Sequence, residues 1–357
     1  MARERAENAA MRIVNGLIAA IALAFACMPA GAQDFRGKTV TLIVGAQAGG
    51  GTDATGRLIA PFLTKYLPGH PSVVVQNVPG ADGVVAANYF VQQVKADGLT
   101  VICGDAPMTD PIRYRAPQSH YDPVKFEYAG GIGRGGSMIV MNSAAERRLH
   151  DRSANPVTIG VAAAVPRSGQ LIAAWGIGFL GWNAKWIVGY RGTGALMIAM
   201  QQGEIDMTAT SNTFSLKSVI DSGQFKVLTQ SGGLQDGKLV PRPEFSGAPL
   251  ISELLAGKLT DPIAQKSFDY WQGVLLADKW LALPPGTPRP IVDVYRKAYR
   301  DMSADPEFNA HGRRLSEVFA PMTDGDIRSL VQAGADAPRE AVEFLDVMLR
   351  KQGITGL

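Results

Sequence analysis

A glycine-rich segment carries residues that are typical of an anion-binding loop. Residues 48–53 read Ala-Gly-Gly-Gly-Thr-Asp and lie between a strand-like run and a helical one. Glycines let the backbone approach a ligand, and the first-turn N–H groups of the following helix carry partial positive charge. A purely structural turn with Thr52 as helix N-cap fits the same residues. The segment has neither the Gly-Lys-Ser/Thr ending of a P-loop nor the Rossmann glycine spacing, so no nucleotide site is predicted.

Two further loops occupy equivalent places at strand ends. Residues 77–83 (Asn-Val-Pro-Gly-Ala-Asp-Gly) follow a strand and open a helix, and residues 190–194 (Tyr-Arg-Gly-Thr-Gly) open another helix. In open α/β sheets the ligand lies beyond the carboxyl ends of the strands. We therefore expect the three loops to converge on one cleft, and three glycine-rich helix starts favour a carboxylate.

The elements that position these loops alternate between β-branched runs and helical segments. This alternation predicts an α/β fold with two doubly wound, largely parallel sheets. The first set has strands at 39–44, 72–76 and 99–103 and helices at 52–67 and 84–94. The second set has strands at 138–141, 157–162, 185–188, 206–210 and 225–229 and helices at 168–180 and 193–202.

Two segments are expected to connect the sets. Residues 130–136 contain five glycines and predict a hinge strand or crossover. A strand-like run at 271–276 is expected to cross back. The predicted organisation is therefore a hinged clamp with the ligand cleft between two lobes, one made of residues 33–135 plus 265–357 and the other of residues 136–264.

The first 32 residues predict a cleavable export signal. Arg12 precedes an apolar run at 13–27, and residues 30–32 (Ala-Gly-Ala) form a small-residue cleavage site. The apolar run is shorter than the roughly 20 residues of a membrane span, so a retained anchor is disfavoured. We expect cleavage after Ala32 and a periplasmic protein.

Composition excludes several classes of partner. The formal net charge is only +3 and is spread without basic blocks, so neither nucleic acid nor a membrane surface is predicted as a partner. Four histidines and two cysteines lack metal-ligand spacing, so we predict no metal and no cofactor. After cleavage only Cys103 remains, and its place at the end of an apolar strand predicts a buried, unreactive thiol.

No catalytic residue is predicted. Ser168 lies between Arg167 and Gly169 and lacks the Gly-x-Ser-x-Gly elbow of a hydrolase. The four histidines lie in polar or turn-rich surroundings, which favour surface positions: His70, His120, His150 and His311. A non-enzymatic protein is expected, with an exported hydrolase as the less favoured alternative.

Five motifs, taken together and in this order, resemble the receptors of tripartite tricarboxylate transporters, also called Bug-type binding proteins. They lie at 41–53, 73–83, 190–194, 203–206 (Gly-Glu-Ile-Asp) and 285–288 (Pro-Gly-Thr-Pro). The resemblance implies a type II periplasmic-binding-protein-like clamp, acting as a monomer, that captures a small organic acid or zwitterionic solute. It also implies delivery to the membrane permease subunits of the transporter. A ligand sensor docking on a two-component kinase is an alternative.

By matching position, the resemblance implies ligand contacts from both lobes. The first lobe would contribute Ala48, Gly49, Gly50, Thr52, Asp53, Gly80, Ala81, Asp82, Gly104 and Asp105. The second lobe would contribute Gly192, Thr193, Gly194 and Asn212.

The chain departs from the family pattern at informative places. It has Gly45-Ala46 where the family usually has Pro-Phe, which enlarges the pocket or removes a stacking face. Asp82 and Asp105 add negative charge beside a site meant for an anion. One hypothesis is a solute that carries a cationic or donor-rich group as well as a carboxylate. The alternative is that both acids point to solvent.

Aromatic and basic side chains remain to be assigned. We expect the five tryptophans to be core residues, except Trp271, which we place beside the cleft at the return crossover. Arg191 could neutralise a ligand carboxylate, but solvent exposure is the leading interpretation. The tryptophans are Trp175, Trp182, Trp186, Trp271 and Trp280.

Overall fold

A computed structural model describes residues 34–162, 164–211, 216, 219–235 and 238–355. The predicted export signal and Asn212 lie outside the described residues. Residues Phe35–Leu357 form one unit by internal contacts. No helix in the described ranges is long and apolar enough to span a membrane.

The first sheet has six strands in the order β13-β4-β12-β3-β1-β2. Strands β1, β2 and β3 run parallel, whereas β12 pairs antiparallel with both β3 and β4, and β13 pairs antiparallel with β4. The strands are β1 (Thr39–Val44), β2 (Ser72–Asn77), β3 (Thr100–Asp105), β4 (Glu127–Gly133), β12 (Lys279–Leu283) and β13 (Ala320–Thr323).

Successive side chains of β1 are buried on opposite faces of this sheet. Leu42 and Val44 enter one cluster with residues of α2 and α12, and Ile43 enters another with residues of α3 and α14. A strand that is apolar at consecutive positions must be covered on both sides. The covering helices are α2 (Gly51–Tyr66), α3 (Val84–Gln92), α12 (Arg289–Ala304), α13 (Pro306–Leu315) and α14 (Asp324–Ala335).

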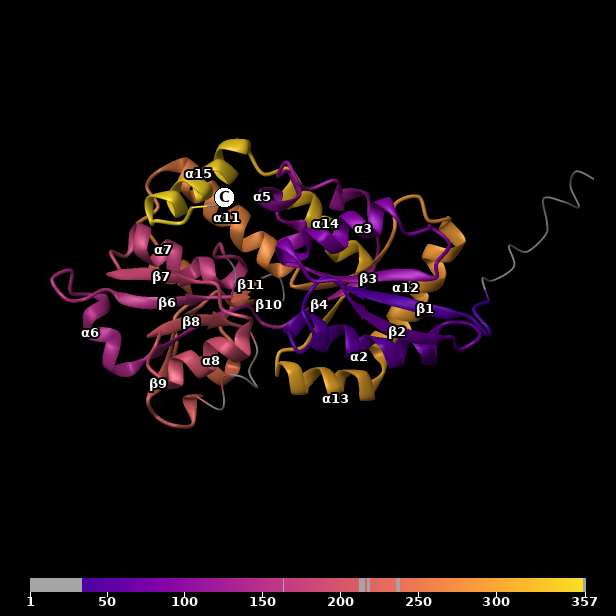
Figure 1. Ribbon diagram of the computed structural model, residues 1–357, viewed down its shortest axis with the longest axis horizontal. Helices are drawn as coiled ribbons and strands as arrows, with labels where there is room; N and C mark the ends of the chain where they lie inside the picture. Colours follow the sequence, from indigo (N-terminus) through magenta and orange to yellow (C-terminus); the bar gives the residue numbers. More distant parts are fainter. Residues whose placement is uncertain (1–33, 163, 212–215, 217–218, 236–237, 356–357) are drawn as a thin grey trace, which may run out of the picture. The chain divides into compact units, whose positions relative to one another are not determined.

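The second sheet has five strands in the order β7-β6-β8-β5-β9 (Figure 1). On β5, Ile139 packs in a cluster with residues of α7, and Val140 packs in one with residues of α8. The strands are β5 (Met138–Asn142), β6 (Val157–Val161), β7 (Ala184–Val188), β8 (Met207–Thr210) and β9 (Phe225–Gln230). The helices include α6 (Glu146–Leu149), α7 (Leu171–Phe179) and α8 (Thr193–Gln201).

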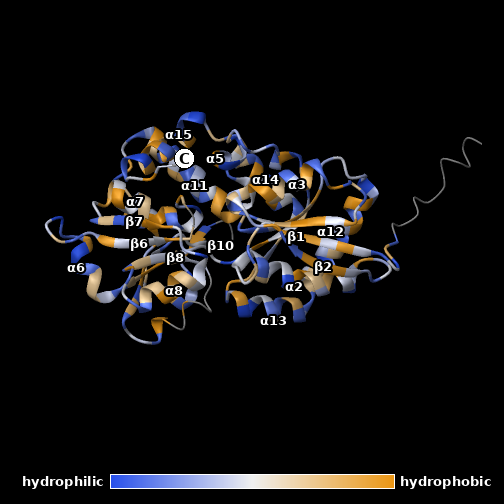
Figure 2. Cartoon of the chain, in the orientation of Figure 1, coloured by the Kyte–Doolittle hydropathy of each residue, from blue (hydrophilic) through white to orange (hydrophobic). Residues whose placement is uncertain are grey.

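Shorter elements and two long helices complete the described chain. Figure 2 shows hydrophobic residues gathered on the strands and hydrophilic ones on outlying helices such as α6 and α13. The remaining helices and strands are α4 (Ala106–Thr109), α5 (Pro111–Tyr114), β10 (Gly233–Gln235), β11 (Lys238–Val240), α10 (Ile251–Leu254), α11 (Pro262–Leu276) and α15 (Arg339–Lys351). Short 3₁₀ turns include η1 (Ala81–Gly83) and η4 (Ser168–Gln170).

The predicted α/β fold with two sheets is confirmed, and strand β1 has the predicted bounds. The expectation of largely parallel sheets is wrong, because five of the nine pairs between the described strands of the two sheets are antiparallel. The predicted strand at 271–276 is wrong, because these residues end helix α11 and the return strand is β12. Asp261 caps α11 by accepting from Ile263 N, and buried residues then recur at helical spacing, at Ala264, Phe268 and Trp271.

Most of the glycine run at 130–136 belongs to a sheet rather than to a hinge. Gly130 and Gly131 lie within β4, where an added Cβ would come within 2.2 Å of the Tyr299 ring and 2.4 Å of Ile327. These glycines therefore let helices α12 and α14 pack closely on the strand. Only the residues from Arg134 to Ser137 cross to the second sheet.

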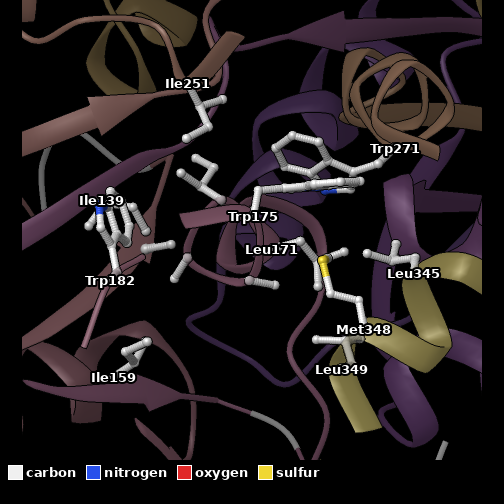
Figure 3. Packing of buried hydrophobic residues seen from close by; sticks show 14 of the residues in the cluster. Ile139, Ile159, Leu171, Trp175, Trp182, Ile251, Trp271, Leu345, Met348 and Leu349 are labelled. Atoms are coloured by element: carbon white, nitrogen blue, oxygen red, sulfur yellow. The ribbon is translucent and has the colours of Figure 1, made fainter. Parts of the chain in front are cut away.

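Helices α11 and α15 bury apolar residues in the core beside α7. Trp271 and Leu345 share a cluster with Trp175 (Figure 3). The same two helices also contact α14 and α5 of the first sheet's side. The lobe boundaries drawn from the sequence therefore stay a prediction.

Four of the five tryptophans are buried, Trp186 is partly buried against the same core, and one prediction is overturned. Trp175, Trp182 and Trp280 are buried as expected. The placement of Trp271 beside the cleft is wrong, because it is 2% exposed and its ring lies 6.1 Å from that of Trp175. Its indole Nε1 donates to Ser168 O at 3.0 Å, so it supports a cavity loop from behind.

We expect the Cys103 thiol to be unreactive while the protein is folded. Cys103 is fully buried, and burial raises the pKa of its thiol to about 12. Because only the thiolate is alkylated, iodoacetamide at pH 8 should label the protein lacking residues 1–32 only after unfolding. Mass spectrometry measures the label, and fast modification of the native protein would contradict this placement.

Candidate functional site

A polar cavity of about 420 Å³ is lined by segments from both sheets. The loop after β1 and the end of β3 contribute from the first sheet, and the loop after β6, the start of α8 and the end of β8 contribute from the second. These are the positions at which α/β proteins bind ligands, and the volume suits a small molecule.

Gly49, Gly50, Gly51 and Thr52 form the first wall of the cavity. Gly49 has φ +83°, a conformation that favours glycine, and Gly50 is the N-cap of α2 without a side-chain capping bond. The first turn of a 16-residue helix therefore begins at the cavity with no side chain capping it.

Asp53 braces this glycine loop from behind. Its carboxylate accepts from Gly49 N at 2.8 Å, from Arg57 Nε at 2.9 Å and from Asn77 Nδ2 at 2.9 Å. Burial by itself would raise the pKa of Asp53, but these bonds hold it below its usual value. Asp53 thus fixes the loop while lying outside the cavity wall.

Helix α8 supplies a second uncapped helix start. Its N-cap is Gly192, at φ +88° and without a side-chain capping bond, and the next residues Thr193 and Gly194 line the cavity. Two helices, one packed beside each sheet, therefore begin at the same cavity. Each brings roughly half a positive charge to its N-terminus.

A largely buried group of charges forms another part of the wall. Arg134 donates to Asp278 through Nε at 2.5 Å and Nη2 at 2.9 Å, and Lys279 Nζ donates to Asp278 Oδ1 at 2.8 Å. Arg134 Nη2 also donates to Ser211 Oγ at 3.0 Å. Burial by itself would raise the pKa of Asp278, but the two cations hold it far below its usual value. The three-residue group carries a net positive charge.

The two unusual acids have different surroundings. Asp105 lines the cavity, and its Oδ2 accepts from Thr52 Oγ1 at 2.8 Å. Asp82 is absent from the cavity wall and pairs with Arg167, while Arg113 Nη2 lies 3.5 Å from its other oxygen. Of these two acids, only Asp105 therefore brings its negative charge to the cavity wall.

The structure brings some of the sequence-predicted residues together and leaves others apart. Gly104 is covered by Trp280, whose ring would lie 2.2 Å from an added Cβ. The described site residues that line the cavity are Gly49, Gly50, Thr52, Asp105, Thr193 and Gly194. Those that do not are Ala48, Asp53, Gly80, Ala81, Asp82, Gly104 and Gly192.

Sequence reasoning missed several residues of the wall. They lie in the segments that cross between the sheets and near the ends of β6 and β8. Treating the loop after every predicted strand as a candidate ligand site would have found some of them. The missed polar residues are Arg134, Ser137, Arg167, Ser168, Gln170, Thr210, Ser211, Asp278 and Lys279.

Another cavity, of about 300 Å³, shares the wall formed by Arg134 and Asp278. Its remaining lining is largely apolar and includes Leu275, Val318 and Phe319. Because this remaining lining offers few polar groups, we place the polar ligand in the larger cavity.

Other candidate groups lie elsewhere. His70, His120 and His150 are exposed, as is Arg191, and His311 packs against Phe62. The exposure expected for Arg191 is therefore confirmed. The described residues contain no cluster of three or more His, Cys, Asp or Glu suited to a metal ion.

No protein-family model matches the sequence. A UPF0065 protein of Bordetella pertussis (strain Tohama I) is 27% identical over 310 residues, which cover 82% of this chain and 84% of that protein. A UPF0065 protein of the gbd 5' region of Cupriavidus necator is 40% identical over 112 residues, and this match spans only 32% of the relative.

Solved structures are similar over most of the chain. The periplasmic binding protein BugD has a TM-score of 0.63 and 21% identity, covering 88% of this chain and 98% of BugD. An R. palustris protein solved with adipate has a TM-score of 0.66 and 22% identity, covering 91% and 100%. The resemblance to the tripartite tricarboxylate transporter receptors is confirmed. The chain therefore has the fold of the periplasmic binding protein BugD.

We expect removal of the Asp278 charge to destabilise the protein strongly. Asp278→Asn leaves Arg134 buried without its counter-ion, which should lower the unfolding free energy by about 3 kcal/mol at pH 7. Because the folded-state pKa is depressed, the difference should shrink as the pH falls below about 3.9, where the unfolded chain takes up the proton. Urea denaturation measures it.

The matched control removes a carboxylate from an exposed pair. Lys297 and Asp301 are 70% and 40% exposed, so Asp301→Asn should cost less than about 1 kcal/mol. Equal losses in the two variants would contradict a structural role for the buried pair.

Proposed function

We propose that the protein is a periplasmic receptor that captures a small carboxylate-bearing solute and delivers it to a tripartite tricarboxylate-type membrane transporter. The observation that carries this proposal is the meeting of two glycine-capped helix starts, those of α2 and α8, at one polar cavity. Free N–H groups and the helix dipole make such ends binding sites for anions.

The charges of the cavity wall support an anionic ligand. Arg134, Arg167 and Lys279 outnumber Asp105 and Asp278 among the charged residues that line it. Since Arg134 and Lys279 are held by Asp278, they provide a fixed positive field rather than mobile side chains. A carboxylate at the helix starts would lie within that field.

Asp105 restricts the kind of carboxylate. Its Oδ2 is occupied by Thr52, and Asp105 remains half-buried on the cavity wall. A solute with a hydroxyl or ammonium group could donate to this carboxylate, whereas a second carboxylate there would be repelled. A hydroxy acid or zwitterion therefore suits the site better than a simple dicarboxylate, as the sequence hypothesis proposed, although only one of its two acids contributes.

The similar structures and the N-terminal pattern support the cellular setting. BugD is described as a periplasmic binding protein, and the R. palustris structure contains adipate. The basic, apolar and small-residue pattern of the first 32 residues is typical of export. Delivery to a permease is carried over from the receptor resemblance.

A screen of solutes tests the proposal directly. Protein lacking residues 1–32 is melted with hydroxy acids, amino acids, dicarboxylates and sugars. A ligand at 100 times its Kd adds about 2.7 kcal/mol of stability, which raises Tm by several degrees. Stabilisation by sugars alone would contradict the proposal.

We expect Gly194→Leu to abolish binding without unfolding the protein. An added Cβ at Gly194 meets nothing within 4 Å, so a leucine can extend from the cavity wall without a clash at its Cβ. Stability should change by less than about 1 kcal/mol, while affinity for the hit falls at least roughly 100-fold. Isothermal titration calorimetry measures the loss.

The control is Gly273→Leu in α11. Gly273 is also helical with open space around its Cβ, but it is absent from the cavity wall. Its variant should bind as the parent does. Full affinity in Gly194→Leu would place the ligand elsewhere.

A further inference from the structure

An ion pair joins the two sheets' loops beside the cavity, and we propose that it is a clasp that holds the cavity closed. It links Arg167, after β6 of the second sheet, to Asp82, after β2 of the first. Arg113 of α5 lies 3.5 Å from the same carboxylate. As a device for solute capture the clasp rests on the proposed function, although its opening can be measured without any solute.

The clasp is a tertiary contact rather than a consequence of chain connection. Arg167 and Asp82 are 85 residues apart in sequence, and neither lies in the segments that cross between the sheets. Their side chains are 32% and 15% exposed. Partial burial shields the pair less well from water than a core would, but it leaves the attraction stronger than at an open surface.

Backbone strain is concentrated at both ends of the clasp. Four described non-glycine residues have positive φ, and three of them are Ala81 (+44°), Asp82 (+55°) and Ser168 (+46°). Such conformations are unfavourable and persist where the surroundings hold them. Ala81 and Asp82 form one end of the clasp, and Ser168 follows Arg167 at the other.

Different contacts hold the strained residue of the second sheet. Trp271 Nε1 donates to Ser168 O at 3.0 Å, and Gln170 Oε1 accepts from Arg167 N at 3.2 Å. The loop carrying Arg167 is therefore fixed to α11 and to its own helical turn. The Asp82 carboxylate is held by Arg167 and Arg113, and of these two partners only Arg167 comes from the second sheet's side.

The charge of the clasp is compatible with an anionic solute. Two arginines share one aspartate, so the three side chains carry a net positive charge. Arg167 is the member that lines the cavity. A carboxylate entering the cavity therefore meets attraction and has no need to displace Asp82.

Spin-label distances test the clasp in the ligand-free protein. In protein lacking residues 1–32, labels are attached through Ile198→Cys on α8 and Arg313→Cys on α13. Both positions are exposed, one on a helix beside each sheet. The buried Cys103 stays unlabelled. Double electron–electron resonance then reports the separation of the two halves in low and high salt.

We expect one short distance at low salt and a growing longer one in 1 M NaCl, which screens the pair. Asp82→Asn keeps a residue that tolerates positive φ but removes the charge, and it should raise the ratio of long to short distances roughly tenfold at low salt. Arg167→Gln should act alike, and the double variant should add nothing further.

The matched control is Arg148→Gln, which breaks a pair with Asp206 of similar exposure, 35% and 18%, within the second sheet's side. It should leave the distances unchanged. Unchanged distances in Asp82→Asn, or equal opening in Arg148→Gln, would overturn the clasp. If the clasp opens as expected but the protein binds no carboxylate, the proposed function is rejected and the clasp is retained.

Discussion

The buried ion pair between Arg134 and Asp278 is the interaction on which the cavity depends. Arg134 follows β4 and Asp278 precedes β12, so the pair joins two segments at which the chain passes between the sheets. Removing Asp278 would leave Arg134 charged and desolvated. The pair therefore holds the two segments together at the cavity wall. This contact fixes the place at which the loops of both sheets meet.

The chemistry of the cavity depends on the N-terminal backbone groups of two helices more than on reactive side chains. The helix starts of α2 and α8 supply N–H groups, Asp53 braces the first of them, and Lys279 adds a fixed charge. Such a wall can bind and orient an anion, and Asp105 then selects among anions by requiring a donor. Binding with selection is what a solute receptor needs.

The strands and the glycine loops were predictable because local composition determines them. The β-branched run of β1 and the glycines after it need no tertiary information. Arg134, Arg167 and Asp278 were missed because they meet only when distant segments pack. Trp271 was misplaced because its short apolar run fits both the helical and the strand periodicity. Gly104 matched a motif of the family, although Trp280 covers it.

Nuclear magnetic resonance of protein labelled with ¹⁵N-glycine and ¹⁵N-threonine tests most directly whether the two helix starts hold the ligand. The solute is the carboxylate with the largest thermal shift. The account predicts that the amide signals of Gly51 and Thr52 in α2 and of Thr193 and Gly194 in α8 shift together on titration, with one Kd. Saturable binding that leaves the amides of both helix starts unmoved would contradict it.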